Sequence, residues 1–257
     1  MGERQDLASI FPTSFVTHNG CLRLHNEDSV LARPEIGLWA VADGMGGHDS
    51  GAYASQTVIE ALSRIPEAEP RLLLSACHEA IREANAEIRR VAQSRCVTIG
   101  TTLALVIVDE KQVACLWCGD SRIYRIRSGA ISLLSRDHTE LQDLLDRGVL
   151  TESEGRNWPN RNVLTHALGV FEEPPTETTT HSLEEDDVFV ICSDGLTAHV
   201  GEDDILACAG RRSPRGGCQA LLDLALSRGG RDNVTVVLIQ YRPNATRRSP
   251  SPQSPAA

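Results

Sequence analysis

The sequence lacks both an excess of positive charge and any long apolar run. Its 257 residues carry 25 Lys and Arg against 35 Asp and Glu, a formal net charge of −10. A basic surface for nucleic acid is therefore not expected. No apolar stretch approaches the ~20 residues that a membrane-spanning helix needs, and residues 1–9 lack the basic start and apolar stretch of a signal peptide. We expect a cytoplasmic protein that binds neither nucleic acid nor membranes.

Paired cysteine motifs are also scarce. Eight cysteines are scattered along the chain, mostly within apolar segments, which predicts buried thiols in a reducing compartment. Cys115 and Cys118 have the CxxC spacing of zinc and redox sites, and no second pair accompanies them. They lie in a strand-like run, where side chains three positions apart point to opposite faces. We therefore interpret this pair as core packing.

Three segments have the apolar period of amphipathic helices. Apolar residues recur every three or four positions over 54–65, 73–91 and 218–226. Pro66 and Pro70 separate the first two segments, because proline interrupts a helix. We expect those two helices to form an antiparallel pair.

Other segments have the composition of β-strands, rich in β-branched and apolar residues. These segments are 101–108, 113–118, 123–127, 130–134, 188–192 and 234–241. Ser128 and Gly129 predict a hairpin turn, and one short helix is expected over 141–145. Neither a βαβ alternation nor a repeat is visible, so the sequence indicates an α+β fold with antiparallel sheets.

One domain is expected over residues 14–242. Residues 1–13 form an N-terminal segment, and 243–257, rich in Pro and Ser, are expected to be disordered. Within the domain, 138–169 is polar and irregular. Asp137, beside this segment, and Asp143, within it, are expected to be surface charges.

Four aspartates stand beside apolar strand-like runs: Asp43, Asp120, Asp194 and Asp232. A carboxylate partly buried at such a place costs free energy unless an opposite charge pairs with it, and Lys and Arg are few nearby. Divalent cations are natural partners, and an all-oxygen site favours Mg²⁺ or Mn²⁺ over zinc. Gly44, after the first aspartate, lets the backbone approach an ion and could offer its carbonyl oxygen.

Six short motifs carry a family resemblance. In chain order they are Arg23–Asp28, Asp43–His48, Gly100–Thr102, Gly119–Tyr124, Ser193–Leu196 and Gly229–Thr235. Together they resemble the metal-dependent protein phosphatases, the protein phosphatase 2C-like family, and in particular its compact bacterial members. The resemblance covers residues 14–241. It implies a four-layer α-β-β-α sandwich, in which helix pairs flank two antiparallel sheets and the metals lie in a cleft at one end.

The resemblance also implies a ligand for each metal ion. Asp43 would bridge two tightly bound ions, Mn²⁺ or Mg²⁺, and the Gly44 carbonyl would bind the first of them. Asp194 and Asp232 would hold the second ion. Asp120, together with Asp194, would hold a weaker third ion.

Two further positions match family residues that act on water and on phosphate, and a third departs from the family's pattern. Asp28 matches a carboxylate that acts through metal-bound water. Arg23 matches the residue whose guanidinium grips the phosphate. Animal members carry a histidine, assigned as general acid, where this chain has Met45. His48 is the bacterial-style alternative for this catalytic role, and a turn histidine bonded to the backbone is the other interpretation of it.

The activity that the resemblance implies is hydrolysis of phosphoserine and phosphothreonine in proteins by a hydroxide that bridges two metal ions. A monomer that reverses a bacterial Hanks-type Ser/Thr kinase is expected, and some relatives accompany type VI secretion machinery. Two alternatives stay open. One is a catalytically dead homologue that binds phosphoproteins, which the full set of aspartates disfavours. The other is a phosphatase for small-molecule phosphates, which would share all the metal residues.

Overall fold

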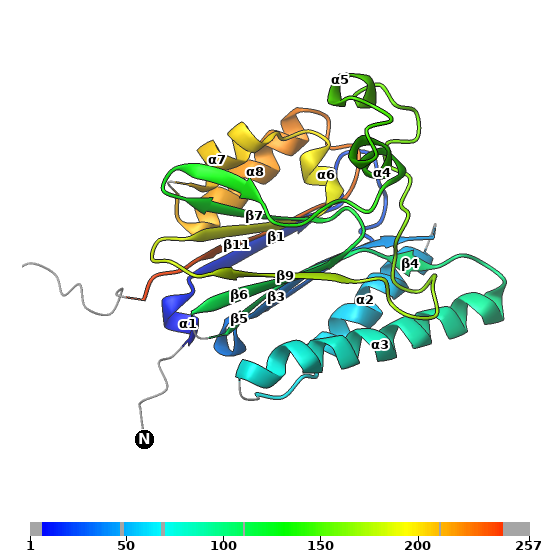
Figure 1. Cartoon of the computed structure of the whole chain (residues 1–257), viewed down its shortest axis with the longest axis horizontal. Helices are drawn as coiled ribbons and strands as arrows, with labels where there is room; N and C mark the ends of the chain where they lie inside the picture. Colours follow the sequence, from blue (N-terminus) through cyan, green and yellow to red (C-terminus); the bar gives the residue numbers. More distant parts are fainter. Residues whose placement is uncertain (1–6, 47–48, 68–69, 110, 211, 244–257) are drawn as a thin grey trace, which may run out of the picture.

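The structure, a computed structural model, describes residues 7–46, 49–67, 70–109, 111–210 and 212–243. Two β-sheets face each other, and helices cover the outer face of each sheet (Figure 1). This α-β-β-α sandwich confirms the α+β fold with two antiparallel sheets that the sequence and the resemblance predicted.

The first sheet contains five antiparallel strands. Their order is β1 (Thr13–His18), β11 (Val234–Gln240), β10 (Val188–Cys192), β7 (Arg122–Arg127) and β8 (Ala130–Leu133). Ser128 and Gly129 form the predicted turn between β7 and β8, and both have positive φ, 51° and 78°. β1 pairs with β11 over its whole length, so the sheet joins the two ends of the domain.

The second sheet contains six strands. Their order is β2 (Asp28–Arg33), β3 (Leu38–Met45), β5 (Leu103–Asp109), β6 (Gln112–Cys118) and β9 (Glu177–Ser182), with β4 (Gly100–Thr101) beside β3. The single strand predicted over 101–108 is therefore wrong in one respect, since Thr102 separates β4 from β5. β1, β2 and β9 were not predicted, because these edge strands carry many polar residues and lack a clear apolar signal.

Two helices lie on each outer face of the sandwich. α2 (Asp49–Ser63) and α3 (Pro70–Arg95) cover the second sheet, and α7 (Glu202–Ala209) and α8 (Pro214–Ser227) cover the first (Figure 1). Shorter helices are α1 (Leu7–Ile10), the 3₁₀ helix η1 (Pro34–Ile36), α4 (Glu140–Asp146), α5 (Glu152–Gly155) and α6 (Asp194–Thr197). α5 and α6 escaped the sequence analysis because four residues are too few to show a helical period. Among the described residues, no helix is both long and apolar enough to cross a membrane.

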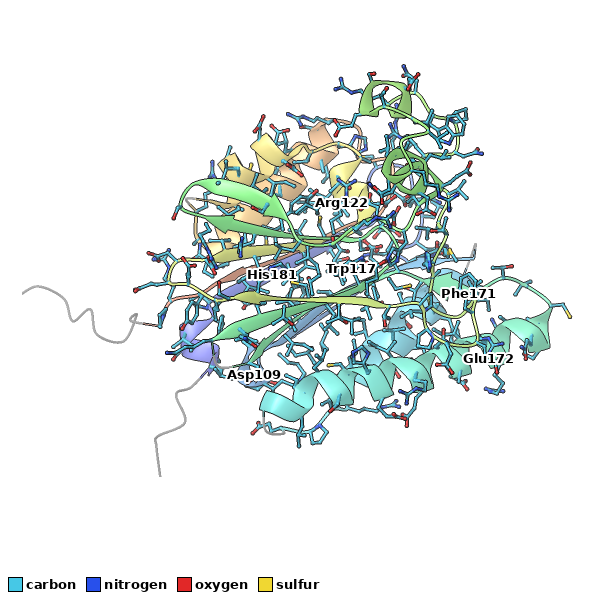
Figure 2. The ribbon with its side chains drawn as sticks, viewed as in Figure 1. Asp109, Trp117, Arg122, Phe171, Glu172 and His181 are labelled. Carbon is cyan, nitrogen blue, oxygen red and sulfur yellow. The ribbon has the colours of Figure 1, made fainter. Side chains whose placement is uncertain are left out.

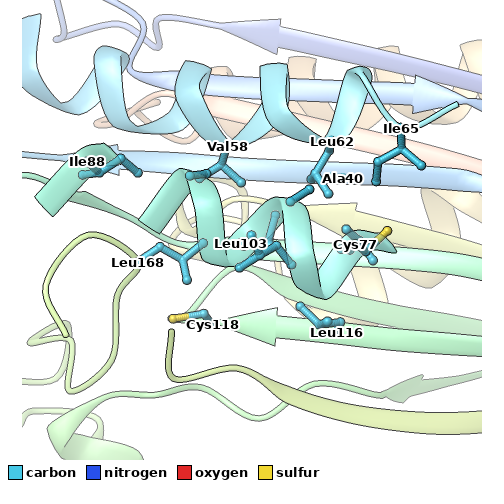
Figure 3. Packing of buried hydrophobic residues seen from close by; sticks show 14 of the residues in the cluster. Ala40, Val58, Leu62, Ile65, Cys77, Ile88, Leu103, Leu116, Cys118 and Leu168 are labelled. Atoms are coloured by element: carbon cyan, nitrogen blue, oxygen red, sulfur yellow. The ribbon is translucent and has the colours of Figure 1, made fainter. Parts of the chain in front are cut away.

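Three apolar clusters hold the layers together. Val58 and Leu62 of α2 pack with Leu103 and Leu116 of the second sheet (Figure 3). Trp39 and other buried side chains fill the space between the two sheets. A third cluster joins the first sheet to α7 and α8. Each sheet is therefore buried on both faces, which explains why its central strands are almost wholly apolar.

The cysteines lie mostly in these clusters. Cys115 contributes to the cluster between the sheets and Cys118 to the cluster beneath α2 and α3. The pair therefore points to opposite faces of β6, as predicted, and cannot share a zinc ion. Cys21 and Cys96 are exposed, which corrects the expectation of buried thiols at these two positions.

Candidate functional site

One end of the sandwich collects the aspartates predicted to bind metal. The end of β10 pairs with the start of β11 and with the start of β7. Asp194 follows β10, Asp232 precedes β11 and Asp120 precedes β7. All three therefore lie at the same end of these neighbouring strands of the first sheet. The antiparallel topology thus brings together residues that are far apart in the sequence.

The second sheet contributes two more carboxylates to this end. Asp28 of β2 lies directly opposite Asp43 of β3 in the antiparallel register. Like charges at opposed positions destabilise a sheet, so this pair indicates a compensating positive charge. Ser193 Oγ donates a hydrogen bond to Asp28 Oδ2 over 2.8 Å. Asp28 Oδ1 is buried and has no hydrogen-bond partner in the described part of the chain.

The crowding of these carboxylates raises their pKa values. Burial raises the pKa of Asp28 to about 6 and that of Asp120 to about 8, and the charge of Asp194 adds to both shifts. Burial and the charge of Asp28 raise the pKa of Asp43 well above its ordinary value. Burial and the charge of Asp232 raise that of Asp194. Each ionised carboxylate therefore disfavours the ionisation of its neighbours unless a cation binds between them.

The residues present fit hard divalent cations. The charged groups of the site that could bind a cation are all carboxylates, and no described residue donates a hydrogen bond to the buried Asp28 Oδ1. Among the described residues, no three acidic, His or Cys side chains are already gathered as a closed metal site. The charge of Asp194 also contributes to the raised pKa of Asp43. A cation bound near both carboxylates would offset the repulsion between them.

Gly44 lies where the end of β3 meets the start of α2. A Cβ atom at this position would lie 2.1 Å from the carbonyl oxygen of Gly51, so no larger residue fits. The Gly44 N–H donates to the carbonyl oxygen of Glu27 over 3.2 Å. The close contacts of Gly44 with the backbones of Gly51 and Glu27 hold the end of β3 in place, and Asp43 with it. The use of the Gly44 carbonyl as a metal ligand stays a prediction.

Arg23 lies beside Asp232, one of the aspartates predicted to bind metal. Its Nη2 donates a hydrogen bond to Asp232 Oδ2 over 2.7 Å, and 54% of its side chain is exposed. The guanidinium is thus accessible to a ligand at the mouth of the site. Its role in gripping phosphate stays a prediction. His48 lies outside the described residues.

Hydroxyl groups that the sequence analysis assigned no role hold Asp43 in place. The Asp43 N–H donates to Thr102 Oγ1 over 3.1 Å, and Thr101 Oγ1 donates to the Asp43 carbonyl oxygen over 2.9 Å. Thr102 Oγ1 lies 2.7 Å from Ser121 Oγ, next to Asp120. These residues belong to the short motifs that carry the family resemblance, and this was the one feature of the sequence that could have indicated their role.

Asn233 holds the segment that carries Arg23. Its Oδ1 accepts a hydrogen bond from the N–H of Glu27 over 2.8 Å. Its Nδ2 donates to the carbonyl oxygens of Asn19 and His25 over 3.0 and 2.9 Å. The amide thus connects this segment to the start of β11, beside Asp232.

A cleft of about 390 Å³ opens beside Asp120 and Asp194, lined by α4, α5, α6 and the loop after α5. Arg122, labelled in Figure 2, lines this cleft together with Asp194 and Thr197 of α6. Arg122 Nε and Nη2 donate to the two carboxylate oxygens of Asp137 over 2.9 and 2.6 Å. Only 13% of the Asp137 side chain is exposed, so its prediction as a surface charge is wrong. The sequence pattern did not reveal this pairing, because its partners are 15 residues apart.

The chain is similar to known phosphatases. The family described as protein phosphatase 2C matches residues 23–213. The serine/threonine protein phosphatase PstP of Mycobacterium tuberculosis is 36% identical over 222 residues, which are 85% of this chain and 43% of that protein. The chain therefore spans less than half the length of this relative.

Two solved structures resemble the fold closely. PppA, described as a key regulatory component of T6SS in Pseudomonas aeruginosa, has a TM-score of 0.83 and 35% identity, covering 89% of this chain and 96% of that one. The catalytic domain of PstP in complex with two manganese ions has a TM-score of 0.79 and 32% identity, covering 90% and 97%. With the matched residues and the shared fold, the chain belongs to the protein phosphatase 2C family.

Proposed function

We propose that this chain is a metal-dependent protein phosphatase that hydrolyses phosphoserine and phosphothreonine. The observation that carries the proposal is the convergence of five aspartates from both sheets, with raised pKa values at Asp28, Asp43, Asp120 and Asp194. Such a cluster suits two divalent cations, as in the manganese complex of the PstP catalytic domain. The relative PstP is named a serine/threonine protein phosphatase, which supports the substrate class.

The bound cations would be held by Asp43, Asp194 and Asp232, with Asp120 serving a weaker third ion. Such cations lower the pKa of a water molecule and offset negative charge on the phosphate. Arg23, which now donates to Asp232, would bind two phosphate oxygens, because the planar guanidinium matches their geometry. Asp28, fixed by Ser193, orients water beside the phosphate. His48 is the candidate for protonating the leaving oxygen.

The finer parts of the proposal concern the setting in which the enzyme works. All eight cysteines are free thiols, which supports a reducing, cytoplasmic compartment. We propose a monomer that reverses a Ser/Thr kinase and uses either Mn²⁺ or Mg²⁺. The catalytic domain is assigned to residues 14–242. Residues 1–13 precede it, with Ile10 and Phe11 packed against it. The tail assigned to 243–257 lies, except for Pro243, outside the described residues.

Turnover of a phosphothreonine peptide tests the proposal. Activity should require Mn²⁺ or Mg²⁺, disappear with EDTA and return when the metal is restored. Phosphorylated sugars and nucleotides, assayed beside the peptide, test the alternative of a small-molecule phosphatase. Full activity in chelator, restoration by Zn²⁺ alone, or a strong preference for the small molecules would contradict the proposal.

A further inference from the structure

The cleft beside the metal aspartates continues along residues 138–169, the segment that carries α4 and α5 and that we call the flap segment. Residues of α4, of α5 and of the loop after α5 line the cleft, among them Glu152, Arg156 and Arg161. Asp120 and Asp194 line the same cleft. A substrate whose phosphate lies at these aspartates therefore has the flap segment beside it.

Two arginines of the flap segment are available to a ligand in this cleft. Arg156 and Arg161 both line the cleft and are exposed. Neither forms an ion pair with any residue that the structure describes. Arg122 and Arg136, nearby in the chain, each bind a carboxylate instead. The guanidinium groups of Arg156 and Arg161 thus keep their full hydrogen-bonding capacity.

The charges around the cleft favour an anion at this wall. Asp137 is neutralised by Arg122, with which it forms two hydrogen bonds. Asp120 and Asp194 belong to the metal site. Among the described residues that line the cleft, Glu152 is then the remaining acidic one, against the guanidinium groups of Arg156 and Arg161. The wall formed by the flap segment therefore carries a surplus positive charge, while the far end of the cleft is acidic.

We propose that Arg156 and Arg161 bind a second anionic group of the substrate, an acidic side chain or a second phosphate near the phosphoresidue that is hydrolysed. This inference rests on the proposed function. A guanidinium binds carboxylate and phosphate through two parallel hydrogen bonds, so both groups share the required chemistry. The cleft, at about 390 Å³, is within the size range of small-ligand sites and admits a peptide side chain beside the reacting phosphate. The preferred substrates are acidic or doubly phosphorylated sequences.

Matched peptides test this inference. Three phosphothreonine peptides differ at one neighbouring position, which carries alanine, glutamate or a non-hydrolysable phosphonate. With Mn²⁺, the wild-type protein should show a kcat/KM about 5- to 30-fold higher for the two anionic peptides than for the alanine peptide, as expected for charge-assisted hydrogen bonds in a partly shielded cleft. Added salt should reduce this preference. A response to the phosphonate peptide alone would restrict the inference to a second phosphate.

The double variant Arg156→Gln/Arg161→Gln should lose the preference while hydrolysing p-nitrophenyl phosphate at the wild-type rate. Arg147→Gln is the matched control, because Arg147 is also an exposed arginine of the flap segment but does not line the cleft. It should keep the preference. Equal kcat/KM for all three peptides in the wild-type protein, or an unchanged preference in the double variant, would overturn the inference.

Equilibrium binding separates this inference from the proposed function. Fluorescence anisotropy of the labelled peptides in EDTA requires no turnover. The double variant should bind the two anionic peptides about 5-fold more weakly than the wild-type protein and the alanine peptide equally well. If the wild-type protein hydrolysed nothing, the proposed function would fail while this difference in affinity would still support the anion site. Identical dissociation constants for both proteins would refute the anion site alone.

Discussion

Ser193 and Asp28 are 165 residues apart in the chain and are joined by a hydrogen bond of 2.8 Å from Ser193 Oγ to Asp28 Oδ2. Ser193 follows β10 of the first sheet, whereas Asp28 begins β2 of the second. The same hydroxyl accepts a hydrogen bond from the N–H of Thr235 over 3.0 Å. One buried side chain therefore connects the two sheets and fixes the direction of the Asp28 carboxylate.

Ser193→Ala should lower both stability and turnover. The buried N–H of Thr235 would lose its acceptor and Asp28 would lose a donor, which costs about 1–3 kcal/mol in free energy of unfolding. Urea unfolding measures the stability, and kcat/KM with a phosphopeptide measures the activity. Ser132→Ala on the exposed face of β8 is the control and should change neither. An unchanged urea midpoint in Ser193→Ala would show that the hydrogen bonds contribute nothing.

Asp43→Asn and Asp194→Asn should each lower kcat by at least roughly 10³-fold, because each removes negative charge that holds the metal ions. Calorimetric titration with Mn²⁺ should show weakened tight binding in both variants. Asp120→Asn should slow turnover with less effect on tight binding. Asp203→Asn, exposed on α7, is the control and should behave as wild type. Two unchanged tight sites in Asp43→Asn would disprove the assigned ligands.

The metal-free protein should lose stability as the pH rises. Burial raises the pKa of Asp28 to about 6 and that of Asp120 to about 8, whereas an unfolded aspartate titrates near pH ~3.9. The folded state therefore holds these protons more tightly, so the stabilisation is complete below the unfolded pKa and is lost as the pH passes through about 6 and then about 8.

Urea unfolding in EDTA at pH values of about 5 and about 8.5 measures this loss. Asp120→Asn should show a smaller decrease between the two conditions, because its side chain cannot ionise. Mn²⁺ should reverse the trend in the wild-type protein, since the cation binds the ionised carboxylates. A wild-type midpoint in EDTA that rises with pH would contradict the proposed protonation of the site.

Arg23→Ala should weaken substrate binding with little effect on folding. The ion pair between Arg23 and Asp232 is largely exposed, so its loss should change the free energy of unfolding by less than about 1 kcal/mol. Loss of a charge-assisted contact to phosphate should raise KM about 10-fold or more. Arg82→Ala removes a comparably exposed ion pair on α3 and is the control. Equal KM values in both variants would exclude Arg23 from the phosphate site.

His48→Ala tests the general acid predicted from the sequence. A serine alkoxide leaves poorly without a proton, whereas p-nitrophenolate leaves readily. If His48 donates that proton, the variant should slow phosphopeptide hydrolysis by about 10²–10⁴-fold and affect p-nitrophenyl phosphate far less. The alkaline side of the pH–rate profile should also flatten. Equal losses on both substrates would make His48 a structural residue of its turn.

The central strands and the long helices could be predicted from the sequence, and so could a set of aspartates as candidate metal ligands. The apolar runs of β10 and β11 are buried on both faces, and the period of α3 is sustained over many turns, so these signals are local and strong. Asp43 and Asp194 became candidate metal ligands because a carboxylate beside an apolar strand is costly without a cation. The edge strand β9 had no such signal, because its residues are mostly polar.

Tertiary structure alone decided which of these residues meet. The opposition of Asp28 and Asp43 follows from the β2–β3 register, and the bond from Ser193 to Asp28 follows from the packing of one sheet on the other. Neither is encoded in local spacing. Arg122 and Asp137 likewise form a part-buried pair because β7 and the residue that precedes the flap segment meet at the cleft. Periodicity reports the face that a residue occupies, whereas its partners depend on long-range pairing that the chain acquires as it folds.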